Sequence, residues 1–138
     1  MRYLLDTNVC IAAMRKQPQV VSRMAQLLPT DCGISAVSTF EILTGVAKCS
    51  NPAGERSKVE ALLKIVDELP FDAAAATNAA LTRAQLESQG LTIGPFDLLI
   101  AGHALSRGLI LVTNNWSEFQ RVPRLLLENW QTTSPTVP

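Results

Sequence analysis

The sequence has few of the residues that several common kinds of site require. Its 138 residues include one histidine and three cysteines, Cys10, Cys32 and Cys49, none of which forms a closely spaced pair. This pattern argues against a disulfide framework and a four-thiolate zinc site, and it fits a reducing compartment such as the cytoplasm. Because the sole histidine, His103, lies inside an apolar segment, a Ser-His-Asp hydrolase is also disfavoured.

Excess charge and long apolar segments are missing as well. Lys plus Arg and Asp plus Glu number 12 each, so the formal net charge is zero. A protein that coats nucleic acid through a general positive field is therefore disfavoured, whereas brief contact with RNA through a local basic rim or a metal ion stays open. The N-terminus has no signal-peptide core, and the most apolar stretch, residues 98–105, is short. We therefore expect no contact with a membrane.

The composition is that of an ordinary folded domain. Hydrophobic residues make up 47% of the chain and charged residues 17%, and the apolar content is aliphatic because aromatic residues make up only 5%. This length and composition predict one domain over residues 1–131. Residues 132–138 are rich in Ser, Thr and Pro and are predicted to form a flexible C-terminal tail.

Short aliphatic runs alternate with helical patterns along the chain. Strands are predicted at residues 3–5, 32–37, 66–69, 109–112 and, as a short fifth, 125–127. Helices are predicted at about 9–16, 18–28, 38–47, 59–65, 73–89 and 97–106, with a loop at 51–54. In this interpretation Thr7 or Asn8 caps the first helix, Ser38 and Glu41 form a capping box, and Asp72 caps the alanine-rich helix. The alternation predicts an α/β fold with a central parallel sheet of about four or five strands, covered by helices on both faces.

Three acidic residues follow strands or begin helices at the same edge of this predicted sheet. Asp6 ends the first strand, Glu41 lies just after the second, and Asp97 begins the helix that leads to the fourth. In a parallel sheet such residues gather at the carboxyl edge, which is where open α/β folds bind ligands. The topology therefore predicts that carboxylates far apart in sequence lie close together.

Clustered carboxylates repel one another unless they bind protons or a cation. Ligands that are all oxygen, without paired His or Cys, favour Mg²⁺ or Mn²⁺ over zinc. Such an ion can orient a water molecule, lower its pKa and stabilise the leaving oxygen of a displacement at phosphorus. The residues thus predict phosphodiester hydrolysis, with Asp6, Glu41 and Asp97 as catalytic metal ligands.

Each of these residues also has a purely structural explanation. Asp6 and Asp97 are each suited to cap a helix, and Glu41 fits the capping box with Ser38. His103, on an aliphatic helix, is interpreted as a buried histidine with one hydrogen bond rather than as a ligand. The convergence of the three acids on one edge is what favours a functional site.

Several motifs along the chain occur in an order that matches a known family. They are residues 4–8 (LLDTN), 34–45 (ISAVSTFEILTG), 93–104 (IGPFDLLIAGHA), 111–115 (LVTNN), 118–123 (EFQRVP) and 127–130 (LENW). Together they resemble the PIN-domain ribonucleases and, within them, the VapC-type toxins of bacterial toxin-antitoxin pairs. The resemblance implies a PIN fold and a magnesium- or manganese-dependent endoribonuclease that cuts structured RNA, often a transfer RNA. It also implies a cytoplasmic homodimer and a small VapB-like antitoxin that blocks the site.

The resemblance also assigns roles to particular residues. Asp6, Glu41 and Asp97 match the metal-binding acids of the family. Many PIN domains have a further acid just after the fourth strand, where this chain has Asn114 and Asn115, and the next acid is Glu118. Either Glu118 reaches the site through a turn, or a second metal ion is held weakly and binds mainly with substrate.

Other polar residues are expected to assist. The residues that match supporting positions or are suited to orient the acids are Asn8, Thr39, Thr113 and Asn115. Arg121 and Arg124 are candidates for contact with substrate phosphate, although two arginines near each other also fit an ordinary solvated surface.

Two other functions remain open from the sequence. A phosphatase of the haloacid-dehalogenase type also has a nucleophilic Asp after its first strand, but it requires a second Asp two residues later, where this chain has Asn8. In a noncatalytic protein-binding module with a degenerate PIN site, the acids would cap helices and the tail would dock a partner.

Overall fold

A parallel five-stranded sheet forms the centre of the computed structural model, which describes residues 1–131. The predicted tail, residues 132–138, lies outside the described residues. The strands are β1 (Tyr3–Leu5), β2 (Cys32–Ser35), β3 (Asp67–Leu69), β4 (Ile110–Val112) and β5 (Leu127–Glu128), in the spatial order β3-β2-β1-β4-β5. At the end of central strand β1, Leu5 pairs with Ile34 on one side and with Val112 on the other.

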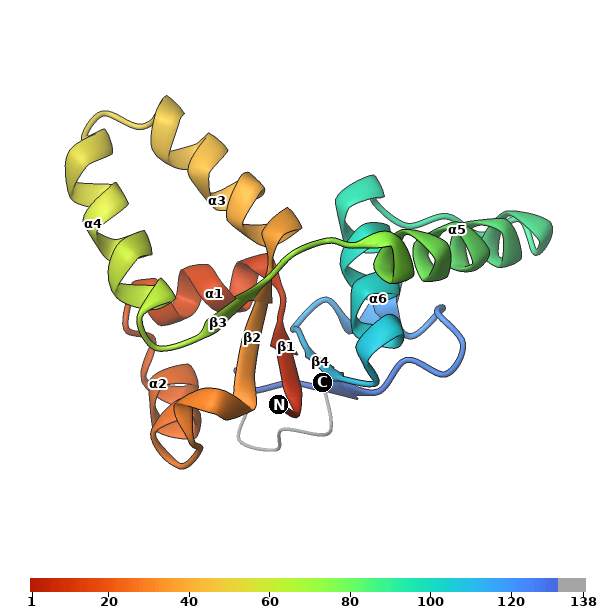
Figure 1. Cartoon of the computed structure of the whole chain (residues 1–138), viewed down its shortest axis with the longest axis horizontal. Coiled ribbons are helices and arrows are strands. Elements are labelled where there is room, and N and C mark those ends of the chain that lie inside the picture. Colours follow the sequence, from red (N-terminus) through yellow and green to blue (C-terminus); the bar gives the residue numbers. More distant parts are fainter. Residues whose placement is uncertain (132–138) are drawn as a thin grey trace.

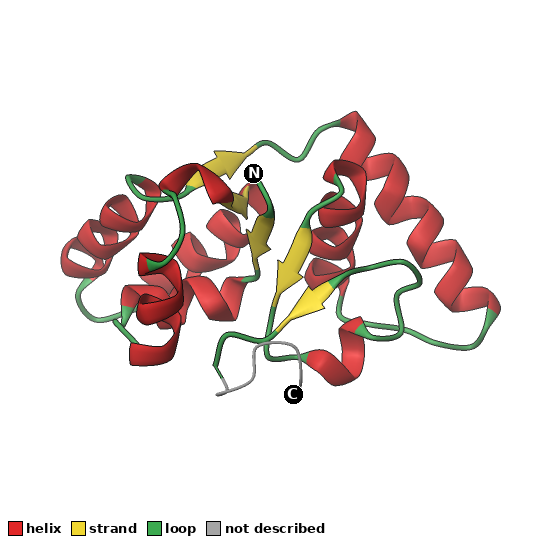
Figure 2. Cartoon of the chain, turned by 90° about the horizontal axis from the view of Figure 1, so that it is seen from below, coloured by secondary structure: helices red, strands yellow, loops and turns green. Residues whose placement is uncertain are grey.

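Helices cover both faces of the sheet. They are α1 (Thr7–Met14), α2 (Pro18–Ala25), α3 (Ala36–Lys48), α4 (Pro52–Leu63), α5 (Ala73–Ser88), α6 (Pro95–Arg107) and α7 (Trp116–Phe119), with a short 3₁₀ helix at Pro29–Asp31. Helices α1 to α4 lie on one side of the sheet, and α5 and α6 lie on the other (Figures 1 and 2). None of the helices in residues 1–131 is long and apolar enough to cross a membrane.

The core has two halves because successive residues of a strand point to opposite faces. Tyr3 and Leu5 of β1 pack with residues of α1 to α4, whereas Leu4 packs with residues of α5 and α6. All three side chains are almost completely buried. The strand therefore consists entirely of large apolar residues, and the predicted fold class, a parallel sheet covered on both faces, is confirmed.

A glycine allows α5 and α6 to pack closely. A Cβ atom placed on Gly102 of α6 would lie 2.5 Å from the backbone nitrogen of Ala79 in α5, closer than real Cβ contacts. Ala79 is itself small and buried. This contact sets the position of α6, the helix that carries Asp97.

The predicted starts of α1 and α3 need correction. Asp6, rather than Thr7 or Asn8, caps α1, because its Oδ1 accepts a hydrogen bond of 2.8 Å from the backbone N–H of Val9. The capping box of Ser38 and Glu41 is wrong, since α3 begins at Ala36 and Ser35 is its cap. Both errors arise where the helix starts directly at the end of a strand, so that no loop separates the two patterns.

Two further boundaries differ from the predictions. The segment predicted as a loop at 51–54 belongs to α4, which Asn51 caps through a 3.2 Å bond from the backbone N–H of Gly54. The helix α7 was not predicted at all. By contrast, Asp72 caps α5 as expected, with Oδ1 accepting from the backbone N–H of Ala75 at 3.0 Å.

Candidate metal centre

Asp6 lies at the centre of the carboxyl edge, between the ends of β1 and β4. Its backbone N–H donates to the carbonyl of Val112 at 3.0 Å and continues the pairing of the two strands. Its side chain is only 4% exposed and is held by the N–H of Val9. Asp6 therefore serves as a helix cap, and its carboxylate is also fixed at the position that the sequence predicts for a metal ligand.

The carboxyl of Asp6 is held in an unfavourable environment for its charge. Its pKa is raised from 3.8 to about 6, chiefly because burial penalises the ionised form. Hydrogen bonds from Thr113 and from the backbone of Val9 and Asn8 lower the pKa, and the negative charge of Glu41 raises it further. A nearby cation would relieve this cost.

Glu41 is positioned by Thr7, which the sequence analysis considered only as a helix cap. The hydroxyl of Thr7 donates to Oε1 of Glu41 at 2.6 Å and lies 3.0 Å from the hydroxyl of Ser38. Thr7 thus connects the first turn of α1 with α3. Its position directly after Asp6, at the start of a helix that faces the same edge, is the signal in the sequence that could have identified it.

Asp97 and Glu118 form the other side of the site. Nδ2 of Asn115 donates to Oε2 of Glu118 at 2.9 Å and lies 3.5 Å from Oδ2 of Asp97. The pKa of Asp97 is raised to about 6, first by partial burial and then by the charges of Asp6, Glu118 and Glu41. The short helix α7 is what brings Glu118 next to Asp97.

The structural explanation of Asp97 as a helix cap is wrong. Gly94 caps α6, and Asp97 is the third residue inside the helix, where its side chain makes no capping bond. Likewise, Glu41 bonds to Thr7 rather than back to its own helix end. Of the three acids, only Asp6 has a capping role.

The donor set fits a divalent cation such as Mg²⁺ or Mn²⁺, since it consists of carboxylate oxygens and the neighbouring carboxylates raise the pKa of Asp6 and of Asp97. In the arrangement of residues 1–131, however, no three His, Cys, Asp or Glu side chains are grouped closely enough to bind one ion. The amide of Asn115 bridges Asp97 and Glu118, and Thr7 holds Glu41. Binding an ion therefore requires these side chains to turn toward Asp6.

The predicted supporting residues differ in whether they contact the acids. Thr113 is fully buried, bonds to Asp6 and accepts from the backbone N–H of Asn115 at 2.9 Å. Asn8 is exposed and contributes its backbone N–H to Asp6. Thr39 donates to the carbonyl of Ser35 at 3.4 Å, within the start of its own helix, so its support for the acids remains a prediction.

The two candidate arginines are separated in the structure. Nη1 of Arg121 donates to the carbonyl of Thr92 at 2.8 Å, shortly before the start of α6. Arg124 instead lines a hollow with Gly108 and Leu109, at the beginning of β4 and therefore at the sheet edge opposite the acids. A role in substrate binding remains a prediction for both, and the geometry favours Arg121.

The single histidine is buried, as predicted. Nδ1 of His103 in α6 lies 2.8 Å from the hydroxyl of Ser35, the residue that caps α3 through the N–H of Val37. Because Ser35 accepts from Val37, its own proton is available to His103, whose Nε2 has no hydrogen-bond partner within residues 1–131. Burial lowers the pKa of His103 below 6.5. The pair connects the two helices that carry Glu41 and Asp97.

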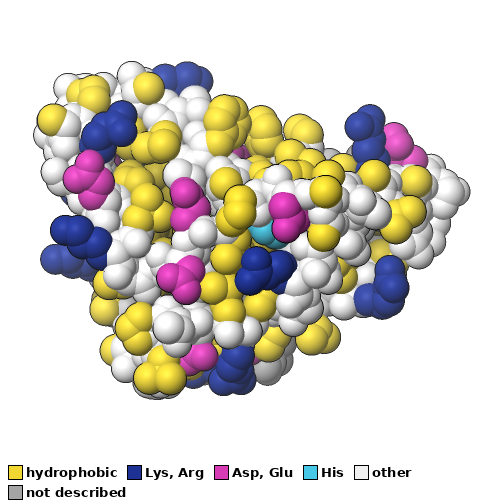
Figure 3. Space-filling model, in the orientation of Figure 1, with side chains coloured by type: hydrophobic (Ala, Val, Ile, Leu, Met, Phe, Trp, Pro, Cys, Tyr) yellow, Lys and Arg dark blue, Asp and Glu magenta, His cyan; other side chains and the backbone are white. Residues whose placement is uncertain are grey.

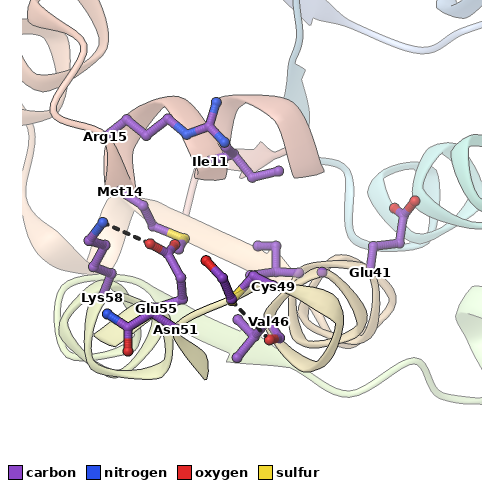
Figure 4. Close-up of a pocket in the computed structure, with 12 residues that line it drawn as sticks. Ile11, Met14, Arg15, Glu41, Val46, Cys49, Asn51, Glu55 and Lys58 are labelled. Carbon is purple, nitrogen blue, oxygen red and sulfur yellow. Dashed lines mark hydrogen bonds and ion pairs between the residues drawn. The ribbon is translucent and has the colours of Figure 1, made fainter. Parts of the chain in front are cut away.

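A groove of about 390 Å³ leads away from Glu41 between α1, α3 and α4. Figure 4 shows Ile11 and Arg15 of α1 on one wall, Val46 of α3 on another, and Glu41 at one end. At the far end, Lys58 and Glu55 of α4 form an ion pair of 2.9 Å. The groove is thus partly apolar and opens next to the carboxylates.

Comparisons with known proteins agree with this geometry. A family model described as the PIN domain matches residues 3–125. The tRNA(fMet)-specific endonuclease VapC of Shigella flexneri is 42% identical over 130 residues, which cover 94% of this chain and 98% of that protein.

Solved structures show the same similarity. VapBC2 from Rickettsia felis, bound to a DNA fragment from its promoter, matches with a TM-score of 0.88 and 37% identity over 94% of this chain and 99% of that one. DNA-bound VapBC from Salmonella typhimurium matches with a TM-score of 0.90 and 35% identity over 94% and 98%. The phosphatase alternative is therefore wrong, and the chain belongs to the PIN-domain family and, within it, to the VapC proteins.

Proposed function

We propose that this protein is a magnesium-dependent endoribonuclease, with Mn²⁺ as an alternative ion, that acts as the toxin of a toxin-antitoxin pair. The observation that carries the proposal is the convergence of Asp6, Glu41, Asp97 and Glu118 from separate elements. Glu41 raises the pKa of Asp6, and the charges of Asp6, Glu118 and Glu41 raise the pKa of Asp97. The names of the VapC relatives, which are endonucleases and ribonucleases, support the same activity.

The residues of the site would have different roles in this reaction. Asp6, fixed by Val9 and Thr113, is the rigid ligand, and Asp97 and Glu41 are the ligands that turn toward it. The bound ion supplies positive charge to the scissile phosphate and lowers the pKa of the attacking water. Asn115 orients Asp97 and Glu118, and Thr7 limits the movement of Glu41. The acids would thus hold the ion, and through it the reacting phosphate, at the sheet edge.

The proposed substrate is a structured RNA, most simply a transfer RNA. The Shigella flexneri relative is named for its action on tRNA(fMet). The zero net charge of this chain implies that specificity comes from RNA shape, since there is no positive field to hold every polyanion. Unpaired loop bases give such a shape. The proposed location, the cytoplasm, is where such a substrate occurs.

The proposed partner is a VapB-like antitoxin, and the proposed assembly contains a homodimer of this chain. The solved relatives are VapBC complexes. The groove between α1, α3 and α4 suits an amphipathic segment, because Ile11 and Val46 offer apolar contacts and Glu41 lies at its end (Figure 4). A basic side chain of that segment, placed beside Glu41, would compete with the metal ion.

The test is cleavage of total cellular RNA by the wild type and by Asp97→Asn, each with Mg²⁺ or with a chelator. We expect discrete fragments only from the wild type with Mg²⁺. Glu60→Gln, which changes an exposed acid of α4, is the matched control and should cut like the wild type. Undiminished cleavage by Asp97→Asn would overturn the proposal. An inactive wild type that is folded and still binds an antitoxin would favour the noncatalytic module.

A further inference from the structure

Two exposed phenylalanines lie directly beside the carboxylates. Phe40 precedes Glu41 in α3, and Phe96 precedes Asp97 in α6. Their ring centroids are 5.4 Å apart, with 57° between the ring planes. The residues are 54% and 41% exposed, respectively. Figure 3 shows a group of hydrophobic side chains along the upper edge of the molecule in that view, over the region where α3 and α6 approach each other.

The exposure of this pair is not explained by packing in the core. The other exposed large hydrophobic residues lie on other elements: Met1, Val21, Leu28, Ile65, Leu81 and Leu126. Phe40 and Phe96 contact each other in a tilted arrangement, which is favourable for aromatic rings. Because both stand on well-formed helices, the pair is held in place before any ligand arrives.

The charge of the site favours an uncharged contact with RNA. Asp6, Glu41, Asp97 and Glu118 repel phosphate until a cation binds, and the nearest candidate arginine, Arg121, is already bonded to a backbone carbonyl. Stacking of a base on an aromatic ring needs no charge. Judged by alanine substitution, it strengthens binding by roughly 5- to 150-fold per base.

We propose that Phe40 and Phe96 form a stacking subsite for an unpaired RNA base next to the phosphate on which the acids act. The inference rests on the proposed function and deepens it, since it names how the substrate is held. A second copy of the chain is the competing occupant, because the proposed assembly contains a homodimer. The position of the two rings beside Glu41 and Asp97 favours RNA.

The experiment measures the binding of two RNA probes by fluorescence anisotropy in the presence of Mg²⁺. One probe is a hairpin with an unpaired loop, and the other is a fully paired duplex of equal length. All proteins carry Asp6→Asn so that the RNA stays intact, and the Mg²⁺ concentration is raised to offset the weaker ion binding expected of this variant. We expect Phe40→Ala and Phe96→Ala each to weaken hairpin binding at least 5-fold and to leave duplex binding unchanged.

Matched variants separate stacking from simple apolar contact. Phe40→Tyr and Phe96→Tyr keep an aromatic face and should bind the hairpin like the parent, whereas Phe40→Leu and Phe96→Leu should be as weak as the alanine variants. Leu81→Ala, at an exposed residue on α5, is the control for loss of surface hydrophobicity. Equal binding by Leu and Tyr variants, or no hairpin binding by the parent, would overturn the proposal.

Light scattering on the same samples decides between RNA and a second copy. If Phe40→Ala changes the oligomeric state but not hairpin affinity, the pair is a contact between copies and the stacking subsite is wrong. Failure of the subsite can be distinguished from failure of the proposed function. If the wild type cleaves RNA but hairpin binding does not change when either phenylalanine is replaced, only the subsite is rejected.

Discussion

At the scale of single residues, Asp6 shows how one side chain carries both structural and chemical roles. It caps α1 and is almost fully buried, yet its pKa of about 6 lies above the ordinary value of 3.8. A carboxyl whose pKa is raised by folding binds its proton more tightly in the folded chain than in the unfolded one. The ionised form therefore destabilises the fold unless a cation is bound.

This gives a prediction for stability against pH. In chelator, the free energy of unfolding contributed by Asp6 should be fully present below about pH 4 and should be lost as the pH rises through about 6. Asp6→Asn removes the charge and keeps an oxygen to cap α1, so it should stabilise the protein at pH 8 by about 2 kcal/mol. Urea unfolding at several pH values measures the difference.

The comparison with the wild type isolates Asp6 from other titrating groups. His103, whose pKa is lowered, acts in the opposite direction and loses stability below about pH 6.5, but it does so equally in both proteins. A difference between wild type and Asp6→Asn that does not change with pH would contradict the prediction.

A second prediction at this scale concerns the coupling between Ser35 and His103. Because the pair is buried and bonded at 2.8 Å, its two members should be coupled. In a double-mutant cycle with Ser35→Ala and His103→Ala, we expect a coupling energy of about 1 kcal/mol in urea unfolding. Purely additive effects would show that the contact does not contribute to holding α3 against α6.

At the scale of elements, close packing of α5 and α6 should be sensitive to one methyl group. Gly102→Ala places a Cβ 2.5 Å from the backbone of Ala79, which cannot move without shifting a helix. We expect a loss of about 2–3 kcal/mol in thermal or urea unfolding.

The matched control is Gly45→Ala in α3, where no atom lies within 4 Å of the new Cβ. There the substitution should stabilise by about 0.5–1 kcal/mol, since glycine inside a helix is unfavourable. If both variants change the free energy of unfolding in the same direction, the close packing of α5 against α6 at Gly102 is contradicted.

The elements also show what the sequence could predict. Strands β1 and β4 are predictable because each is a continuous apolar run, and the order of strands and helices determines that Asp6, Glu41 and Asp97 share one edge. Helix starts were harder. Ser35 and Ser38 are both suitable caps, and only the end of β2 decides that the helix begins after Ser35.

Residues whose role depends on three-dimensional contact were not predictable from local patterns. Thr7 bonds to Glu41 across a separation of 34 residues, and Ser35 bonds to His103 across 68. The helix α7 covers only four residues, Trp116–Phe119, too few for a periodic pattern, so the sequence could not decide whether Glu118 reaches the site. The acids were identified from topology, and their hydrogen-bond partners required the structure.

At the scale of the whole molecule, the sheet serves to gather negative charge in a chain that is neutral overall. The carboxyl ends of β1 and β4 and the starts of α6 and α7 bring acids to one edge. The zero net charge means that the field of this site is not offset by a general positive surface. A bound cation is then the simplest way to make the edge attractive to phosphate.

The most direct test of this account is to measure the binding of Mn²⁺ by titration calorimetry at pH 7.5. The wild type should bind the ion, Asp6→Asn and Asp97→Asn should weaken binding at least 10-fold, and Glu60→Gln should bind like the wild type. Binding that is unaffected by Asp6→Asn and Asp97→Asn, or absent from the folded wild type, would contradict the claim that these carboxylates form a metal centre.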